Sequence, residues 1–215
     1  LVAVHISDEQ LAQYRSQGFL IVERFLTEVE RAAAIDGVFT LFSRSYDDYV
    51  AAGRHNNSPQ HRVFPWDHSG LNHVVVHPDL ISAAERILGT HEIRLDEGHL
   101  GMKYAGEEHW TDFHIDYGNN TLGPIIEPDD FMHLACFYCF DDVDETTAPI
   151  RMVPNGRPDD EWVPMVVPGG SVCLYSIYTA PCGVTVHRQP RPPSGDVGGF
   201  HPQGPPVGRC RTFTY

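Results

Sequence analysis

The order in which helix and strand patterns follow one another constrains this chain most. Before Gly89 the apolar residues recur at helical spacing, and after it they fall into short runs separated by Gly, Pro, Asn and Asp clusters. These runs predict short strands at residues 91–96, 98–104, 131–140, 150–153, 163–167, 171–178 and 209–215. Helices followed by consecutive strands indicate an α+β protein that is mainly β.

Two helix starts are marked by capping boxes. Ser7 is followed three residues later by Gln10, and Thr27 is followed three residues later by Glu30. In each pair the first side chain accepts from the backbone of the second residue, whose own side chain reaches back. Gly18 is placed to end the first of these helices.

Other segments of the first half are less regular. Residues 19–22 are predicted to form a short buried strand, and residues 79–88 a third helix. Residues 44–70 are polar and contain Pro and His, which predicts a long loop and a candidate lid over a substrate. Residues 189–208, rich in Pro and Gly, are predicted to be a second loop before the last strand.

Several short antiparallel strands with turns between them are what a two-sheet jelly roll needs. The mouth of such a double-stranded β-helix (cupin-like) barrel can hold a metal and a small ligand. A chain of 215 residues is within the range of one all-β domain. We predict one domain over residues 1–215, with helices in residues 1–90 packed on one sheet and a jelly-roll core in residues 91–215.

Charge and cysteine content exclude several classes of protein. A formal net charge of -14 leaves too little positive surface to neutralise a phosphate backbone, which argues against nucleic-acid binding. Five cysteines without zinc-ribbon spacing argue against a secreted disulfide scaffold and favour a reducing compartment. No apolar stretch approaches the length of a membrane span. We therefore expect a cytoplasmic protein that acts on a small molecule, with its oligomeric state open.

The residues with the clearest chemistry are His114 and Asp116. On an extended segment, residues two apart point to the same side, so an imidazole nitrogen and a carboxylate oxygen there can bind one ion. Two histidines and one carboxylate form the facial triad of iron(II) oxygenases, which leaves positions open for cosubstrate and dioxygen. A second His-x-Asp, at His77 and Asp79, is more simply a helix N-cap, because Pro78 stands where a helix begins.

Longer stretches of the sequence resemble the phytanoyl-CoA dioxygenase family of iron(II)- and 2-oxoglutarate-dependent oxygenases. Residues 11–22 resemble its N-terminal helix and strand, and residues 107–120 resemble the segment with its iron ligands. Residues 131–144 and 150–155 resemble the inner strand and the Pro-containing turn that follow. Residues 169–176 resemble the glycine-led strand before its distal histidine. The resemblance covers nearly the whole chain.

The resemblance also implies the rest of the site. The histidine and aspartate of the motif would bind iron(II), and Lys103 and Phe137 match positions that contact 2-oxoglutarate in the family. Arg209 or Arg211 would hold the distal carboxylate of 2-oxoglutarate, because a guanidinium pairs with a carboxylate through two hydrogen bonds. Strand alternation puts both arginines on one side and does not choose between them. Arg209 is favoured slightly by its distance from the closing Tyr215.

The chain departs from the family at the second histidine. Counted from Gly170 without gaps, that position falls on Pro181, whose side chain has no metal-binding atom. His187 is the nearest downstream candidate, and it requires a loop about six residues longer than usual. His201 is a poorer candidate, and Cys182 is a further alternative.

The activity that the resemblance implies is a dioxygenase using iron(II), 2-oxoglutarate and O2. It would hydroxylate or otherwise oxidise a small organic substrate and release succinate and CO2. The carboxylate of Asp116 argues against a halogenase, in which this position is small so that chloride can bind the iron. Tyr117, Asn119 and Trp66 are candidate substrate contacts, and ordinary loop packing explains them equally well.

Two alternatives stay open. The first is a cupin-like metal enzyme that does not use 2-oxoglutarate. The second is a jelly-roll ligand-binding protein that has lost its metal site, and Pro181 favours it. Iron binding separates the second alternative from both enzymes, and succinate formation separates the first from a 2-oxoglutarate-dependent oxygenase.

Overall fold

The computed structural model describes residues 5–53, 62–95, 98–102, 104, 113–114, 133–147, 149–182 and 206–214, with the backbone alone at residues 62–63 and 206–214. The helices of this part are α1 (Asp8–Gln17), α2 (Glu28–Leu41), α3 (Tyr46–Ala51), α4 (Ser69–Val75) and α5 (Pro78–Leu88). None of the described helices combines the length and the apolar character that crossing a bilayer requires.

The strands form two sheets. They are β1 (Phe19–Val22), β2 (Arg62–Val63), β3 (Arg94–Leu95), β4 (His99–Met102), β5 (His133–Cys139), β6 (Arg151–Val153), β7 (Val163–Pro164), β8 (Ser171–Ser176), β9 (Ala180–Cys182) and β10 (Pro206–Thr214). The larger sheet has the order β1-β8-β5-β10-β4-β2, with β3 also paired to β10, and the smaller one has the order β7-β6-β9.

Every pairing between these strands is antiparallel. After β5 the chain crosses to the smaller sheet for β6 and β7, returns for β8, crosses again for β9 and returns for β10. Repeated crossing between two antiparallel sheets is how a jelly roll is wound. The predicted arrangement of two antiparallel sheets with helices before them is therefore confirmed.

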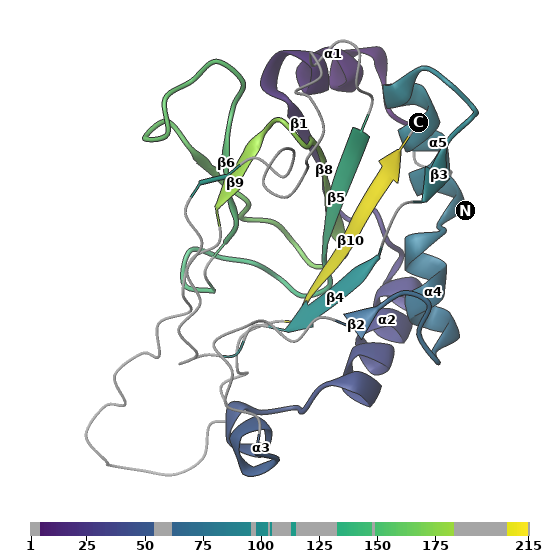
Figure 1. Cartoon of the computed structure of the whole chain (residues 1–215), viewed down its shortest axis with the longest axis vertical. Helices are drawn as coiled ribbons and strands as arrows, with labels where there is room; N and C mark the ends of the chain where they lie inside the picture. Colours follow the sequence, from purple (N-terminus) through teal and green to yellow (C-terminus); the bar gives the residue numbers. More distant parts are fainter. Residues whose placement is uncertain are drawn as a thin grey trace, which may run out of the picture.

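The larger sheet is covered on both faces. Figure 1 shows α2, α4 and α5 on one side of it, with β6 and β9 on the other. Side chains along β5 alternate accordingly. Leu134 and Tyr138 belong to the apolar cluster shared with the helices, whereas Phe137 and Cys139 belong to the cluster shared with the smaller sheet. We call these the helix side and the inter-sheet side.

Both predicted capping boxes are present. The Ser7 backbone donates to Gln10 Oε1 at 2.9 Å, and the Gln10 backbone donates to Ser7 Oγ at 3.2 Å. The second box, at the start of α2, is complete in the same way. Gly18 ends α1 with a φ of 82°, and a Cβ there would lie 2.3 Å from Thr179 Oγ1. Only glycine satisfies both conditions.

The prediction of one long loop over residues 44–70 is wrong in part. α3, β2 and the start of α4 lie in this segment, and residues 54–61 lie outside the described part. Ser45 begins α3 by accepting from the Asp48 backbone, and α4 buries Leu71, Val74 and Val75. Short helices of this kind depend on burial against the core more than on their own sequence, and α4 packs on α2.

Strand boundaries also differ from the predictions. β9 had no prediction of its own, and β10 begins at Pro206, inside the stretch over residues 189–208 that was predicted as a loop. The strand predicted over residues 163–167 ends at Pro164, although Val167 still forms a single bridge with Val143. The helix predicted over residues 79–88 is α5, which begins one residue earlier, at Pro78.

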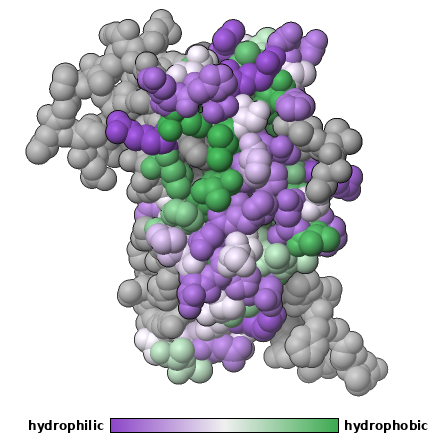
Figure 2. All heavy atoms as spheres, turned by 90° about the vertical axis from the view of Figure 1, so that its right-hand side faces the viewer, coloured by the Kyte–Doolittle hydropathy of each residue, from purple (hydrophilic) through white to green (hydrophobic). Residues whose placement is uncertain are grey.

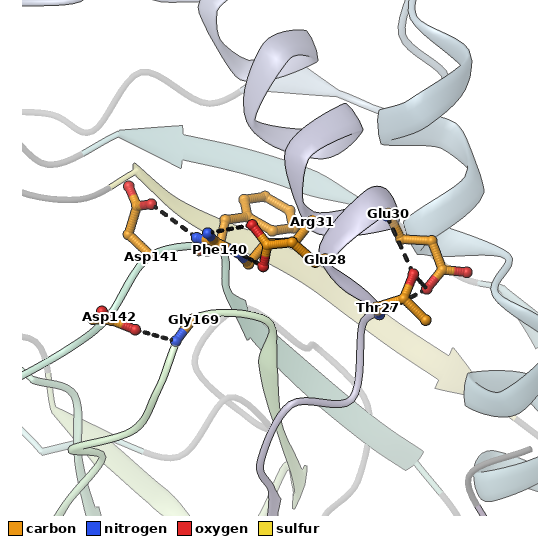
Figure 3. Close-up of polar contacts among 8 residues, drawn as sticks. All are labelled: Thr27, Glu28, Glu30, Arg31, Phe140, Asp141, Asp142 and Gly169. Carbon is orange, nitrogen blue, oxygen red and sulfur yellow. Dashed lines mark hydrogen bonds and ion pairs between the residues drawn. The ribbon is translucent and has the colours of Figure 1, made fainter. Parts of the chain in front are cut away.

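Arg31 ties the helix layer to the end of β5. As Figure 3 shows, its guanidinium lies between Glu28 on its own helix and the residues that follow β5. Arg31 Nη1 donates to the Phe140 carbonyl at 2.9 Å, and the same nitrogen lies 3.4 Å from Asp141 Oδ1. The neighbouring Asp142 accepts from the Gly169 backbone at 2.7 Å, which fixes the turn that leads into β8. These contacts thus hold the end of β5 close to the start of β8.

Candidate functional site

The inter-sheet side of β5 is an apolar wall. Phe137 and Tyr175, from neighbouring strands, stack with ring centroids 5.0 Å apart and an interplanar angle of 4°. Both side chains are buried and share their cluster with Met152 of the smaller sheet. A stacked aromatic pair of this kind fixes the position of each ring. Phe137 therefore lies between the two sheets, and its contact with 2-oxoglutarate stays a prediction.

The register of the larger sheet aligns further residues with Phe137. Arg209 of β10 is its Cα partner on one side and Cys173 of β8 on the other, and His99 of β4 is the next partner beyond Arg209. The backbone of Arg209 is therefore level with the aromatic wall. The side chain of Arg209 lies outside the described part.

The two candidate arginines do not stand in the same relation to β5. The pairing of β10 with β5 is regular up to Cys210, and the register then shifts before Phe213. Arg211 lies inside this shift, so alternation along the strand does not determine its direction. The choice between Arg209 and Arg211 therefore stays a prediction, and only the backbone of Arg209 is aligned with Phe137 by a regular register.

His114 lies beside β9. Its backbone N–H donates to the carbonyl of Pro181 at 3.3 Å, so the segment that carries the His-x-Asp motif borders the outer edge of the smaller sheet. Pro181 is the position on which the count for the second histidine fell. The structure therefore brings His114 and Pro181 together, and the role of this position in metal binding stays a prediction.

The two faces of β9 distinguish Pro181 from Cys182. Pro181 is the Cα partner of Met152, which is buried on the inter-sheet side, whereas Cys182 is the partner of Arg151. The Arg151 guanidinium lies 4.2 Å over the ring of Trp162, on the other face of the sheet. Cα partners share a face, so Cys182 faces away from the inter-sheet side. Cys182 as a substitute ligand stays a prediction that this orientation does not favour.

Several predicted site residues lie outside the described part of the chain. They are Asp116, His187, Lys103, Tyr117 and Asn119, together with the alternative ligand His201. Their roles stay predictions.

Trp66 lies among the helices. It packs on the edge of Phe64 with ring centroids 5.8 Å apart, next to the helix-side core. Its backbone exchanges two hydrogen bonds with the side chain of Asn72, at 2.9 and 2.7 Å. These contacts explain its position by packing alone, and a substrate contact there stays a prediction.

One group of polar side chains was missed. Glu30, His73 and His77 meet at the junction of α2, α4 and α5, with their ligand atoms within 4.8 Å of one another. The sequence signals were a His-x3-His spacing and the glutamate of a capping box, which lie too far apart in the chain to be connected without the fold. The N-cap prediction for His77 is confirmed, since its Nδ1 accepts from the Asp79 backbone at 3.1 Å.

Comparison with known proteins gives similarity of structure only. No family model matches the sequence, and no curated protein matches it. Among solved structures, the non-heme alpha ketoglutarate dependent carbocyclase SnoK from nogalamycin biosynthesis has a TM-score of 0.73 at 16% identity, over 100% of this chain and 86% of SnoK.

Two further structures carry ligands. HygX from Streptomyces hygroscopicus, with nickel and 2-oxoglutarate bound, has a TM-score of 0.70 at 11% identity, over 98% of this chain and 88% of HygX. The epimerase SnoN, in complex with Fe3+, alpha ketoglutarate and nogalamycin RO, has a TM-score of 0.67 at 13% identity, over 96% and 82%. The chain therefore has the fold of these enzymes, while membership of the phytanoyl-CoA dioxygenase family stays a prediction.

Proposed function

We propose that this chain is a non-haem iron(II)- and 2-oxoglutarate-dependent dioxygenase that oxidises a small organic molecule. The observation that supports the proposal most is the hydrogen bond from the His114 backbone to the Pro181 carbonyl, at the edge of β9. The fold shared with SnoN, solved with Fe3+ and alpha ketoglutarate, and with HygX, solved with nickel and 2-oxoglutarate, supports it. The proposal takes residues 1–215 as one domain that works in the cytoplasm.

The donor set fits iron(II) in its chemistry. His114 would supply an imidazole nitrogen and Asp116 a carboxylate oxygen, two positions on in the same segment. His187 would supply the second imidazole in place of the residue that Pro181 replaces. Two imidazoles and one carboxylate are the set that non-haem iron oxygenases use.

The aromatic wall and the arginine of β10 would bind the cosubstrate. Arg209, level with Phe137 in the sheet, would pair with the distal carboxylate of 2-oxoglutarate. Lys103, next to the end of β4, would add a second positive charge. The stacked Phe137 and Tyr175 would exclude water from one side of the pocket and keep the cosubstrate in one orientation.

Iron with 2-oxoglutarate and O2 supplies the oxidising power to remove a hydrogen atom from a substrate, with release of succinate and CO2. The chain's own part is to bind and orient the substrate beside the metal, for which we propose Tyr117, Asn119 and Trp66. Hydroxylation is the proposed outcome, because Asp116 occupies the coordination position that a halide would need. Similar structures include a carbocyclase and an epimerase, so the test must detect oxidation of any kind.

The test is anaerobic titration of the full chain with iron(II) and 2-oxoglutarate, followed by admission of oxygen and measurement of succinate. The wild type should bind both and release succinate, and His114→Ala and Asp116→Ala should do neither. His187→Ala should lose iron binding, while His201→Ala, a matched change at the other downstream candidate, should keep it. Succinate release that survives in His114→Ala would overturn the proposal.

A second candidate function is favoured by Pro181. A jelly roll with no donor at this position could bind a small ligand without a metal. This candidate predicts that iron has no effect on ligand binding and that no variant of the motif changes it. Succinate release from the wild type would exclude it.

A further inference from the structure

The junction of α2, α4 and α5 brings together two imidazoles and a carboxylate. Glu30 Oε1 lies 3.1 Å from His77 Nε2 and 3.3 Å from His73 Nε2. His77 is almost fully buried and His73 is about half exposed, so the group opens to solvent on one side. Figure 2, which views the molecule from the side of α4 and α5 in Figure 1, shows mostly hydrophilic residues on this face.

The spacing of these atoms suits a tetrahedral metal. Zinc binds histidine nitrogen and carboxylate oxygen at about 2.0–2.2 Å, and the edge of such a tetrahedron is about 3.3–3.5 Å. The two distances to Glu30 are within a few tenths of an ångström of this edge, so an ion requires only small side-chain movements. A fourth position toward solvent, beside His73, is left for water.

The carboxylate of Glu30 is held in place by its other oxygen. Glu30 Oε2 accepts from the Thr27 backbone at 2.8 Å and from the Thr27 hydroxyl at 2.7 Å. Burial raises the pKa of Glu30, but the hydrogen bonds from Thr27, His73 and His77 outweigh it and lower the pKa to about 2. Glu30 is therefore ionised at neutral pH, with one oxygen fixed and the other directed at both imidazoles.

The helix cap at His77 competes with metal binding. Because Nδ1 of His77 accepts from the Asp79 backbone, the single proton of the neutral ring sits on Nε2 and is donated to Glu30. A metal at Nε2 displaces this proton to Nδ1, and the Asp79 N–H then loses its acceptor. Losing such a cap lowers an equilibrium constant by about fivefold to tenfold, which is small beside the affinities of three-ligand zinc sites.

We propose that Glu30, His73 and His77 form a binding site for a divalent transition metal, zinc(II) in the first place, which cross-links α2 to the junction of α4 and α5. This site is separate from the proposed iron site. His77 packs on Phe25 with ring centroids 5.2 Å apart, and Phe25 packs on Tyr138, which belongs to the helix side of the larger sheet. His114 borders the smaller sheet, beyond the opposite face.

The experiment is calorimetric titration of the EDTA-treated full chain with zinc chloride, in a background with His114→Ala and Asp116→Ala so that the proposed iron site is removed. We expect one zinc per chain with a micromolar or tighter dissociation constant. His73→Asn and Glu30→Gln should each weaken the affinity at least thirtyfold. Glutamine still completes a capping box, so the second variant keeps the start of α2 intact.

The matched control is His91→Ala. His91 also pairs with a carboxylate, Glu85 at 3.0 Å, but it is highly exposed and belongs to no group of potential metal ligands among the described residues. Its loss should change the zinc affinity less than twofold. Cobalt(II) in place of zinc should give the visible absorption of a four-coordinate ion, and His73→Asn should abolish it.

Two results would overturn the proposal. The first is no zinc binding by the folded background chain that carries His114→Ala and Asp116→Ala, which would leave the group as a hydrogen-bonded helix cap only. The second is equal affinity in this background with and without His73→Asn, with circular dichroism confirming that both are folded. Neither result bears on iron binding at His114, so the two proposals can fail independently.

Discussion

The two sides of the larger sheet are built from the same strands and pack against different layers. On the helix side, Leu134 and Leu174 are fully buried in the cluster shared with the helices, and the side chains are mainly aliphatic. On the inter-sheet side, Phe137 is equally buried, stacks on Tyr175 and is the Cα partner of Arg209. Both faces therefore stabilise the fold, and only the proposed function gives the inter-sheet side an additional role in binding.

The largest expected effect is on the helix side. Leu134→Ala should lower the free energy of unfolding by about 3 kcal/mol, because it removes buried methyl groups and leaves a cavity. Urea denaturation followed by circular dichroism measures this. Leu134→Met, which nearly conserves volume, should lose less than about 1.5 kcal/mol. A loss below about 1 kcal/mol in the alanine variant would show that the helices do not pack tightly on this face.

The next prediction concerns the inter-sheet side and depends on the proposed function. Phe137→Leu should lower stability by about 1 kcal/mol, because it loses the stack with Tyr175 while keeping most of the volume. The affinity for 2-oxoglutarate, measured by anaerobic titration, should fall about tenfold, which corresponds to about 1.4 kcal/mol.

Tyr138→Leu is the matched control, since Tyr138 is the next residue in β5 and faces the helices. It should destabilise the chain at least as much as Phe137→Leu and leave the affinity for 2-oxoglutarate unchanged. If both variants lower the affinity for 2-oxoglutarate to the same degree, the two faces are not functionally distinct.

A smaller effect is expected where the helix layer is tied to the sheet. Arg31→Met should cost about 1 kcal/mol, because the Phe140 carbonyl loses a charged donor at a partly exposed site. Arg157→Met is the control. Its ion pair with Glu161 is exposed on both sides, so its loss should cost less than about 0.5 kcal/mol. Thermal unfolding measures both losses of stability. Equal losses in Arg31→Met and Arg157→Met would mean that the contacts of Arg31 stabilise the fold no more than an exposed ion pair does.

Local signals predicted most of the fold. The boxes at Ser7 and Thr27 and the glycines at Gly18 and Gly89 determine helix ends through hydrogen bonds between near neighbours, so sequence alone is sufficient. The strands of the larger sheet other than β2 were recognisable because buried strands have continuous apolar runs. α4 was not predicted, because its buried residues make sense only against α2, a contact between distant parts of the chain.

The candidate site was predictable in part for the same reason. His114 and Pro181 were singled out by a motif and by a count along the chain, and the structure shows them hydrogen-bonded, while their roles in metal binding stay predictions. The register shift beyond Cys210 and the group of Glu30 with two histidines result from pairing between distant segments, which no local pattern encodes. Such features require the three-dimensional structure.

The smallest expected effect is a pH dependence on the helix side. Glu30 has a pKa lowered from 4.5 to about 2, so its ionised form stabilises the folded state. This contribution is complete above pH 4.5 and disappears as the pH falls toward 2, because the carboxyl then takes up a proton in both states. At neutral pH it should amount to about 1 kcal/mol, since the side chain is partly open to solvent. The difference in unfolding free energy between wild type and Glu30→Gln, measured with urea, should shrink over this interval. A difference that is constant from pH 6 to 2 would show that the carboxylate charge adds nothing beyond the capping geometry, which glutamine also provides.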